Sequence, residues 1–211
     1  AATSAITSAW QQTDDIRQHM LYFLENHDEQ RIASTFFAGE ARRGVPAMMA
    51  SMLMQQNPFM LYFGEEYGER GMDHEGFSGC DGRTTIFDYW SIDTLCRAAS
   101  RKLTADEKLV YAQHEQTMQI ARREKAISEG TFFDLMYVNP HLHRQYAFLR
   151  HIGHDLLLVV VNFEDHEVDV DVNLPKHAFD FLQVASGEYV ATELWSKTKT
   201  NIDLQPDKAV R

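Results

Sequence analysis

The protein has 211 residues, which is enough for one sizeable domain or two small ones with separate cores. Apolar residues make up 44% of the chain and charged residues 24%, an ordinary globular composition that excludes intrinsic disorder. The net charge of −11, with no cluster of Lys or Arg, argues against a nucleic acid or an anionic membrane as partner. The longest wholly apolar run, Leu156–Val161, is too short to span a membrane. We expect a soluble protein, and the sequence leaves its compartment open: cytoplasmic, or secreted or periplasmic.

The first 130 residues have the pattern of helices joined to short apolar runs. Residues 4–19 predict an amphipathic helix, and the run 19–24 predicts a strand that is buried on both faces. Residues 44–56 are rich in Ala and Met and predict a buried helix, after which 57–63 predict a second buried strand. This strand–helix–strand order indicates two parallel strands, because a hairpin would need a short connection.

A long polar, glycine-bearing segment, residues 64–103, follows the second strand, and segments of this length inside compact domains are usually functional. Thr104 and Glu107 then form a capping-box pattern that predicts the start of a long helix, which Gly130 ends. Three apolar residues are expected to share its buried face: Leu109, Ile120 and Ile127.

After residue 131 the hydrophobic period changes to two, which is typical of strands. Residues 168–174 predict a half-buried strand, and Leu156–Val161 predicts a covered strand joined to it by a hairpin turn at Glu164 and Asp165. Further short strands are predicted at Phe179 and Phe181, at 190–194 and at 202–204. This part therefore predicts a small all-β sandwich.

One segment carries an unusual density of polar groups directly after the first predicted strand. These groups are Glu25, Asn26, His27, Asp28, Glu29 and Arg31. The carboxyl ends of parallel strands face a shared crevice in which ligands bind. From the spacing alone, a ligand site and a solvated loop that caps the next helix both remain open.

The segment Phe23–Asp28, Phe-Leu-Glu-Asn-His-Asp, resembles the fourth conserved region of the α-amylase family, glycoside hydrolase family 13. In that family the region lies at the end of the seventh strand of a (β/α)8 barrel. The resemblance continues in order along the chain: Asn57–Gly68 resembles the eighth strand and its exit, Asp81–Tyr89 the Arg-containing segment that follows, and Tyr146–Phe163 the C-terminal sandwich.

The resemblance implies roles for five residues of the polar segment. Asp28 matches the carboxylate that stabilises the oxocarbenium-like transition state, and His27 matches an imidazole that hydrogen-bonds the same sugar. Asn26 is expected to orient its neighbours at the substrate site. Glu29 and Arg31 are expected either to bind neighbouring sugars or to form a surface ion pair.

The resemblance also implies what this sequence does not contain. Retaining hydrolysis needs a nucleophile and an acid/base carboxylate, which the family carries on the fourth and fifth strands. Neither motif is present, and a complete barrel needs about 250 residues. We therefore expect a partial, C-terminal portion of a (β/α)8 TIM barrel in residues 1–132 and an antiparallel Greek-key β-sandwich in 133–211, an α/β plus all-β chain that is inactive alone. The family's calcium site lies mostly in the missing part, so we expect no metal or other cofactor here.

Two functions remain open. The resemblance implies part of a retaining hydrolase or transglycosylase whose partners are an α-glucan and the N-terminal remainder of the barrel, in the same or another chain. The alternative is a non-catalytic amylase-like scaffold or carbohydrate-binding module. The presence of both His27 and Asp28 favours the enzyme, because a scaffold does not need that pair.

Overall fold

A computed structural model describes residues 3–71, 81–87 and 92–211 of the chain. The chain divides into two compact units. The unit that we call the strand–helix–strand unit consists of Met20–Met52 and Asn57–Gln119. The other, the sheet unit, consists of Ala1–His19, Leu53–Gln56 and Ile120–Arg211. The expected domain boundary between residues 132 and 133 stays a prediction.

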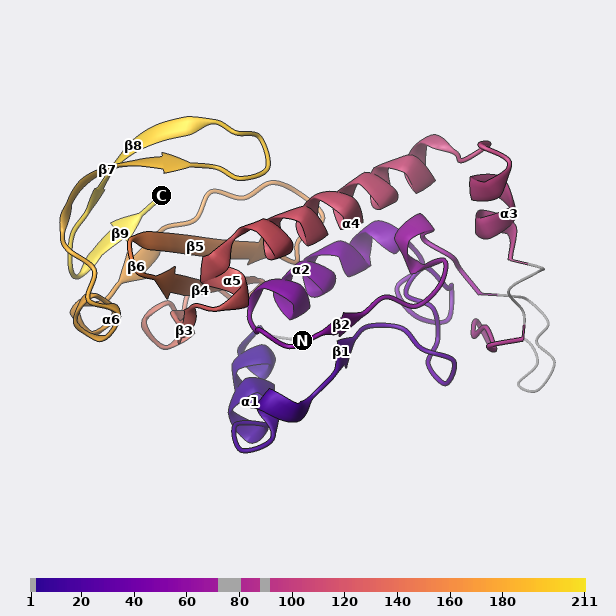
Figure 1. The fold of residues 1–211 in the computed structure, drawn as a ribbon, viewed down its shortest axis with the longest axis horizontal. Helices are drawn as coiled ribbons and strands as arrows, with labels where there is room; N and C mark the ends of the chain where they lie inside the picture. The colour runs from indigo at the N-terminus through magenta and orange to yellow at the C-terminus, as the bar shows by residue number, and fades with distance from the viewer. Residues whose placement is uncertain (1–2, 72–80, 88–91) are drawn as a thin grey trace. The chain divides into compact units, whose positions relative to one another are not determined.

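The strand–helix–strand unit contains a parallel pair of strands, as the apolar runs predict (Figure 1). Strand β1, Tyr22–Phe23, pairs with β2, Phe59–Met60, in the register Tyr22 to Phe59 and Phe23 to Met60. Helix α2, Val45–Leu53, connects them along the chain. The predicted parallel order is confirmed, although both strands are shorter than the apolar runs that contain them.

The 3₁₀ turn before α2 lies close to the segment after β1 at Gly44 and Ile32. A 3₁₀ turn, Ala41–Gly44, leads into the helix, whose Ala and Met residues favour helix and fill buried space. A methyl group at Gly44 would lie 2.8 Å from two side-chain carbons of Ile32. Any larger residue at position 44 would therefore force the Ile32 side chain to shift.

The described residues of the segment 64–103 include short helical elements. A 3₁₀ helix, Glu65–Tyr67, lies between Gly64 and Gly68, both with positive φ, and α3 covers Asp93–Ala99. Residues 72–80 and 88–91 lie outside the described part, so the expectation that the whole segment is functional is not tested there.

Helix α4, Ala105–Arg123, begins with the predicted capping box. The Thr104 backbone N–H donates to Glu107 Oε2 at 2.8 Å, and the Glu107 N–H donates to Thr104 Oγ1 at 3.2 Å. The predicted buried face is only partly correct. Ile120 is buried, but Leu109 is 54% exposed and its neighbour Val110 is buried instead.

Thr104→Ala is expected to lower the free energy of unfolding by about 1 kcal/mol, because the Glu107 N–H at the helix start loses its acceptor. Urea denaturation measures this difference. The control is Gln119→Ala on the exposed side of α4, which should change stability by less than about 0.5 kcal/mol. Equal effects of the two substitutions would show that the box does not stabilise the helix.

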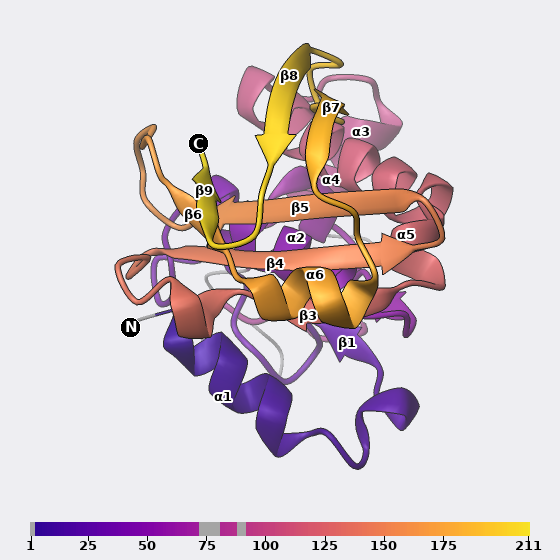
Figure 2. The same ribbon diagram turned by 90° about the vertical axis from the view of Figure 1, so that its left-hand side faces the viewer.

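The sheet unit is built on three antiparallel strands in the order β3–β4–β5 (Figure 2). They are β3, Thr131–Asp134, β4, Gln145–Ile152, and β5, Asp155–Asn162. Two further antiparallel pairs are β6, Val172–Leu174, with β9, Lys208–Val210, and β7, Gly187–Thr192, with β8, Lys199–Leu204.

Two expectations for this unit are wrong. Strand β5 pairs with β4 and not with β6, so the turn at Glu164 and Asp165 does not close a hairpin. Phe179 and Phe181 lie in a helix, α6, Lys176–Leu182, and not in a strand. The part after residue 131 is therefore not all-β.

Helix α6 covers the three-stranded sheet in Figure 2, and the core of the unit lies at this contact. The buried residues of this core come from the sheet, from α6 and from the strands that follow it. They are Phe133, Leu135, Leu142, Ala147, Leu149, Val172, Leu174, Ala178, Phe179, Leu182 and Leu204. The apolar residues of α6 thus contribute to the core from a helix, where the sequence predicts a strand.

The N-terminal helix α1, Ser4–Gln12, is shorter than predicted and is followed by a 3₁₀ turn, Arg17–His19. Thr7 Oγ1 donates to Asp134 Oδ2 at 2.6 Å, and the buried Tyr146 hydroxyl donates to the same oxygen at 2.9 Å. This shared carboxylate fastens α1 to the first two strands of the sheet.

Arg150 on β4 is buried and joins three chain segments of the sheet unit. Its guanidinium donates to the carbonyls of Met54 at 2.7 Å, Ala126 at 2.9 Å and Gly130 at 2.9 Å, and also to that of Ile127. These carbonyls lie at the end of α2 and around α5, Lys125–Ser128, where helix C-termini leave acceptors without partners. Burial lowers the pKa of Arg150 to about 10.

A 3₁₀ turn, Met136–Val138, follows β3.

Candidate functional site

The polar segment lies where the sequence predicts it, directly after β1. Leu24–Glu29 leave the carboxyl end of this strand, whose neighbour β2 runs in the same direction. In parallel α/β sheets this is the edge at which loops form ligand sites. The fold therefore presents these residues at a position suited to a site.

Asn26 organises the turn. Its Oδ1 accepts hydrogen bonds from the backbone N–H groups of Asp28 and Glu29, each at 2.8 Å. Such a side-chain-to-backbone turn is a common use of asparagine, because its short side chain reaches the amides two and three residues ahead. The arrangement fixes the backbone at Asp28.

His27 and Asp28 point away from the interior. Their side chains are 56% and 77% exposed, and His27 Nε2 lies 3.5 Å from Asp28 Oδ2. Glu29 is exposed as well. A carboxylate, an imidazole and a second carboxylate are thus free to contact a solute at one turn.

Arg31 is separated from these three groups. It is fully buried, and its guanidinium donates to Glu25 Oε2 at 2.7 Å, to Thr84 Oγ1 and to the Phe63 carbonyl at 2.8 Å. It also lies over the ring of Tyr62, 4.4 Å from the ring centre. The arginine forms a buried ion pair, not the surface pair that the sequence left open, and its donors are directed inward.

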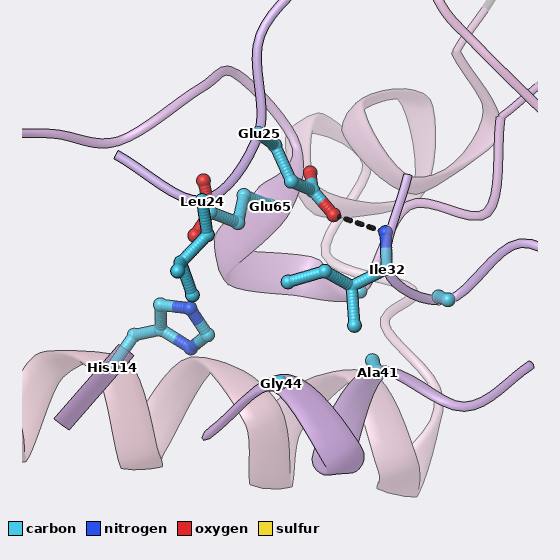
Figure 3. Close-up of a pocket in the computed structure, with 9 residues that line it drawn as sticks. Leu24, Glu25, Ile32, Ala41, Gly44, Glu65 and His114 are labelled. Carbon is cyan, nitrogen blue, oxygen red and sulfur yellow. Dashed lines mark hydrogen bonds between the residues drawn. The ribbon is translucent and has the colours of Figure 1, made fainter. Parts of the chain in front are cut away.

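Glu25 is counted in the sequence analysis among the polar groups after the first strand, but it is assigned no role there. It is buried, and its second oxygen, Oε1, accepts the Ile32 backbone N–H at 2.7 Å (Figure 3). Burial raises its pKa, an effect that the charge and hydrogen bond of Arg31 oppose. A glutamate and an arginine six residues apart, on either side of a polar loop, are the sequence signal that could have indicated this pair.

Glu65 is a second buried carboxyl beside this pair. Burial, together with the nearby charge of Glu25, raises its pKa to about 8. Its Oε2 accepts the Tyr62 N–H at 3.1 Å, and its Oε1 has no partner among the described residues. At neutral pH the Glu65 carboxyl is therefore largely protonated.

Figure 3 shows Glu25 and Glu65 on the wall of a small cavity, with His114 of α4 on the opposite side. The cavity has a volume of about 10 Å³, which is the space of one water molecule and too small for a sugar ring. His114 Nδ1 contacts the Val110 carbonyl at 2.9 Å, and burial lowers the pKa of this imidazole. This cavity therefore does not accommodate a sugar ring.

Solved structures resemble the chain over almost its whole length. A maltogenic α-amylase, AmyB, from Thermotoga neapolitana superposes with a TM-score of 0.60 at 14% identity, over 97% of this chain and 41% of that one. The chain has the fold of α-amylase-family enzymes. A debranching enzyme from Nostoc punctiforme gives a TM-score of 0.59 at 16% identity, over 99% of this chain and 39% of its own.

An isomaltulose synthase variant from Erwinia rhapontici NX5, in complex with its natural substrate sucrose, gives a TM-score of 0.54 at 19% identity and covers 100% of this chain and 44% of its own. The chain thus spans less than half of the length of these enzymes, which combine a TIM barrel with a C-terminal domain. No family model and no curated protein sequence matches the chain. None of the helices in the described ranges is both long and apolar enough to cross a membrane.

Proposed function

We propose that the chain is part of a retaining glycoside hydrolase or transglycosylase of the α-amylase type, which acts on α-1,4-glucosidic bonds. The observation that carries the proposal is the turn at the carboxyl end of β1, where Asp28 and His27 are open to solvent in a chain with the α-amylase fold. Soluble α-glucan oligosaccharides or polysaccharides are the proposed substrates.

The proposed mechanism assigns each residue of the turn a task. Positive charge builds up on the sugar ring in the transition state, and the Asp28 carboxylate stabilises it while holding ring hydroxyls. His27 donates a hydrogen bond to the same sugar. Asn26 keeps the turn in shape through its two backbone contacts, and Glu29 contacts a neighbouring sugar.

The remaining barrel strands are proposed to supply the nucleophile and the acid/base carboxylate. In the described residues β1 and β2 form a two-stranded sheet, and Leu21 and Phe23 beside its edge are 49% and 41% exposed. Unpaired edges and exposed apolar side chains of this kind are usually covered by further structure. We propose that the covering structure is the N-terminal part of a barrel, in the same or another chain.

Asp28→Asn in the full-length protein is expected to lower kcat for maltooligosaccharide cleavage about a hundredfold, because the neutral amide no longer offsets the charge of the transition state. The measurement is product formation by chromatography. The 211-residue chain alone should release no product.

Asp180→Asn is the matched control, since it removes a carboxylate of a surface ion pair with Lys176 and should leave kcat unchanged. Equal rates for the Asp28 and Asp180 variants would disprove the role of Asp28. If the full-length protein binds maltooligosaccharides without cleaving them, the carbohydrate-binding module is the correct function.

A further inference from the structure

We propose that Glu25 and Arg31 are a positioning pair that holds the Asn26–Gln30 loop, and with it Asp28, in its working place; this role rests on the proposed function. Glu25 stands directly before the loop, and its two oxygens contact the two residues directly after it. Oε2 accepts from Arg31 Nη1 and Oε1 from the Ile32 N–H, both at 2.7 Å. One carboxylate thus closes the base of the loop.

Arg31 fastens this base to the rest of the strand–helix–strand unit. Besides Glu25 it contacts Thr84 Oγ1 and the carbonyl of Phe63, which follows β2. Its backbone N–H donates to the Gly82 carbonyl at 2.9 Å. Because a guanidinium offers donors in a fixed planar fork, these contacts set the direction of Arg31 as well as its distance.

Burial strengthens the ion pair between Glu25 and Arg31 and favours it over a pair between Arg31 and Glu65. Arg31 is 0% exposed and Glu25 2% exposed, so water neither screens the pair nor replaces either partner. Glu65 is a further acid whose charge would interact with Arg31, and its raised pKa keeps it largely neutral at pH 7. The charge of Arg31 therefore stays with Glu25.

The exposed residues of the loop depend on this base. Among the described residues, the polar groups of the His27 and Asp28 side chains are paired with each other, at 3.5 Å between His27 Nε2 and Asp28 Oδ2. The positions of these two side chains are therefore set by the backbone. Glu25 and Arg31 fix the base of the loop, and the Asn26 side chain fixes the turn by accepting from the Asp28 and Glu29 amides. A loosened base would therefore move the Asp28 carboxylate without altering its chemistry.

The test compares three variants of the full-length protein: Glu25→Gln, Arg31→Lys and the control Glu40→Gln. Glu40 forms an exposed ion pair with Arg42, so the control makes the same carboxyl-to-amide change at the surface. Hydrogen exchange of the Asp28 and Glu29 amides measures the local stability of the loop, and the melting temperature measures the stability of the whole protein. The values of kcat and KM on maltooligosaccharides measure catalysis. We expect both amides to exchange at least tenfold faster in Glu25→Gln and Arg31→Lys, and kcat to fall at least tenfold with a smaller change in KM.

Three results would overturn the proposal: unchanged exchange in both variants, exchange that rises equally throughout the chain, or local loosening with unchanged kcat. Arg31→Lys keeps the charge and loses the fork, so it provides a second reading if Glu25→Gln lowers the melting temperature. If the wild-type protein does not cleave the oligosaccharides, the proposed function fails, whereas the exchange measurement still decides whether the pair holds the loop.

Discussion

Arg150→Met is expected to lower the free energy of unfolding by about 3–5 kcal/mol, because several buried carbonyls lose their charged donor and each such loss costs about 1–3 kcal/mol. Methionine keeps most of the apolar stem but leaves the carbonyls of Met54, Ala126, Ile127 and Gly130 without their donor. Each buried acceptor without a partner adds a desolvation penalty. Urea denaturation followed by far-UV circular dichroism measures the loss.

Arg144→Met is the matched control, because Arg144 is exposed and its substitution should change stability by less than about 0.5 kcal/mol. Arg150→Lys should recover only part of the loss, since one ammonium group cannot reach carbonyls on three segments. A similar stability of the Arg150→Met and Arg144→Met proteins would show that these carbonyls find other donors.

Glu65→Gln is expected to flatten the dependence of stability on pH. The folded protein holds the Glu65 proton up to about pH 8, whereas the unfolded chain releases it near the ordinary value of 4.5. Between these values the folded state binds more protons, so the free energy of unfolding of the wild type falls as pH rises, by up to about 1.4 kcal/mol per pH unit. Glutamine mimics the protonated acid and does not ionise, so the variant loses this slope.

Urea denaturation at a series of pH values from 5 to 8 measures both slopes. Glu115→Gln, at an exposed position of α4, is the control and should follow the wild type. The variant at position 65 should become the more stable protein at the upper end of the range. Parallel curves for the wild type and Glu65→Gln would contradict the proton-bound state of this carboxyl.

The fold elements that the sequence predicts correctly are those with a local cause. The apolar runs around β1 and β2 and the Ala/Met segment of α2 suffice for a parallel strand–helix–strand order. The capping box of α4 depends on two residues three apart, and it forms as expected. Such features require no knowledge of distant partners.

The wrong expectations have non-local causes. Two phenylalanines at alternating positions indicated a strand, but Ala178, Phe179 and Leu182 are buried together as one face of α6 against the sheet. Strand β6 pairs with β9 near the C-terminus. The turn residues beside β6 contain no information about this distant partner.

The candidate site divides in the same way. The position of Asn26, His27 and Asp28 follows from their place at the end of a strand, which the sequence shows directly. The spacing of Glu25 and Arg31 could have indicated their pairing, but not the burial of Arg31, which depends on Thr84 and on the Phe63 carbonyl, both distant along the chain. The roles of these residues in sugar binding stay predictions.

The close approach of Gly44 to Ile32 means that a substitution just before α2 can change the conformation of the Asn26–Gln30 loop. Ile32 carries the amide that Glu25 holds, so a bulkier residue at position 44 would push on the loop base from behind, without touching any group proposed to meet a sugar. Laboratory evolution for altered turnover should therefore select changes at the beginning of α2 as well as around Asp28, and a map of contacts to the substrate alone would not explain them.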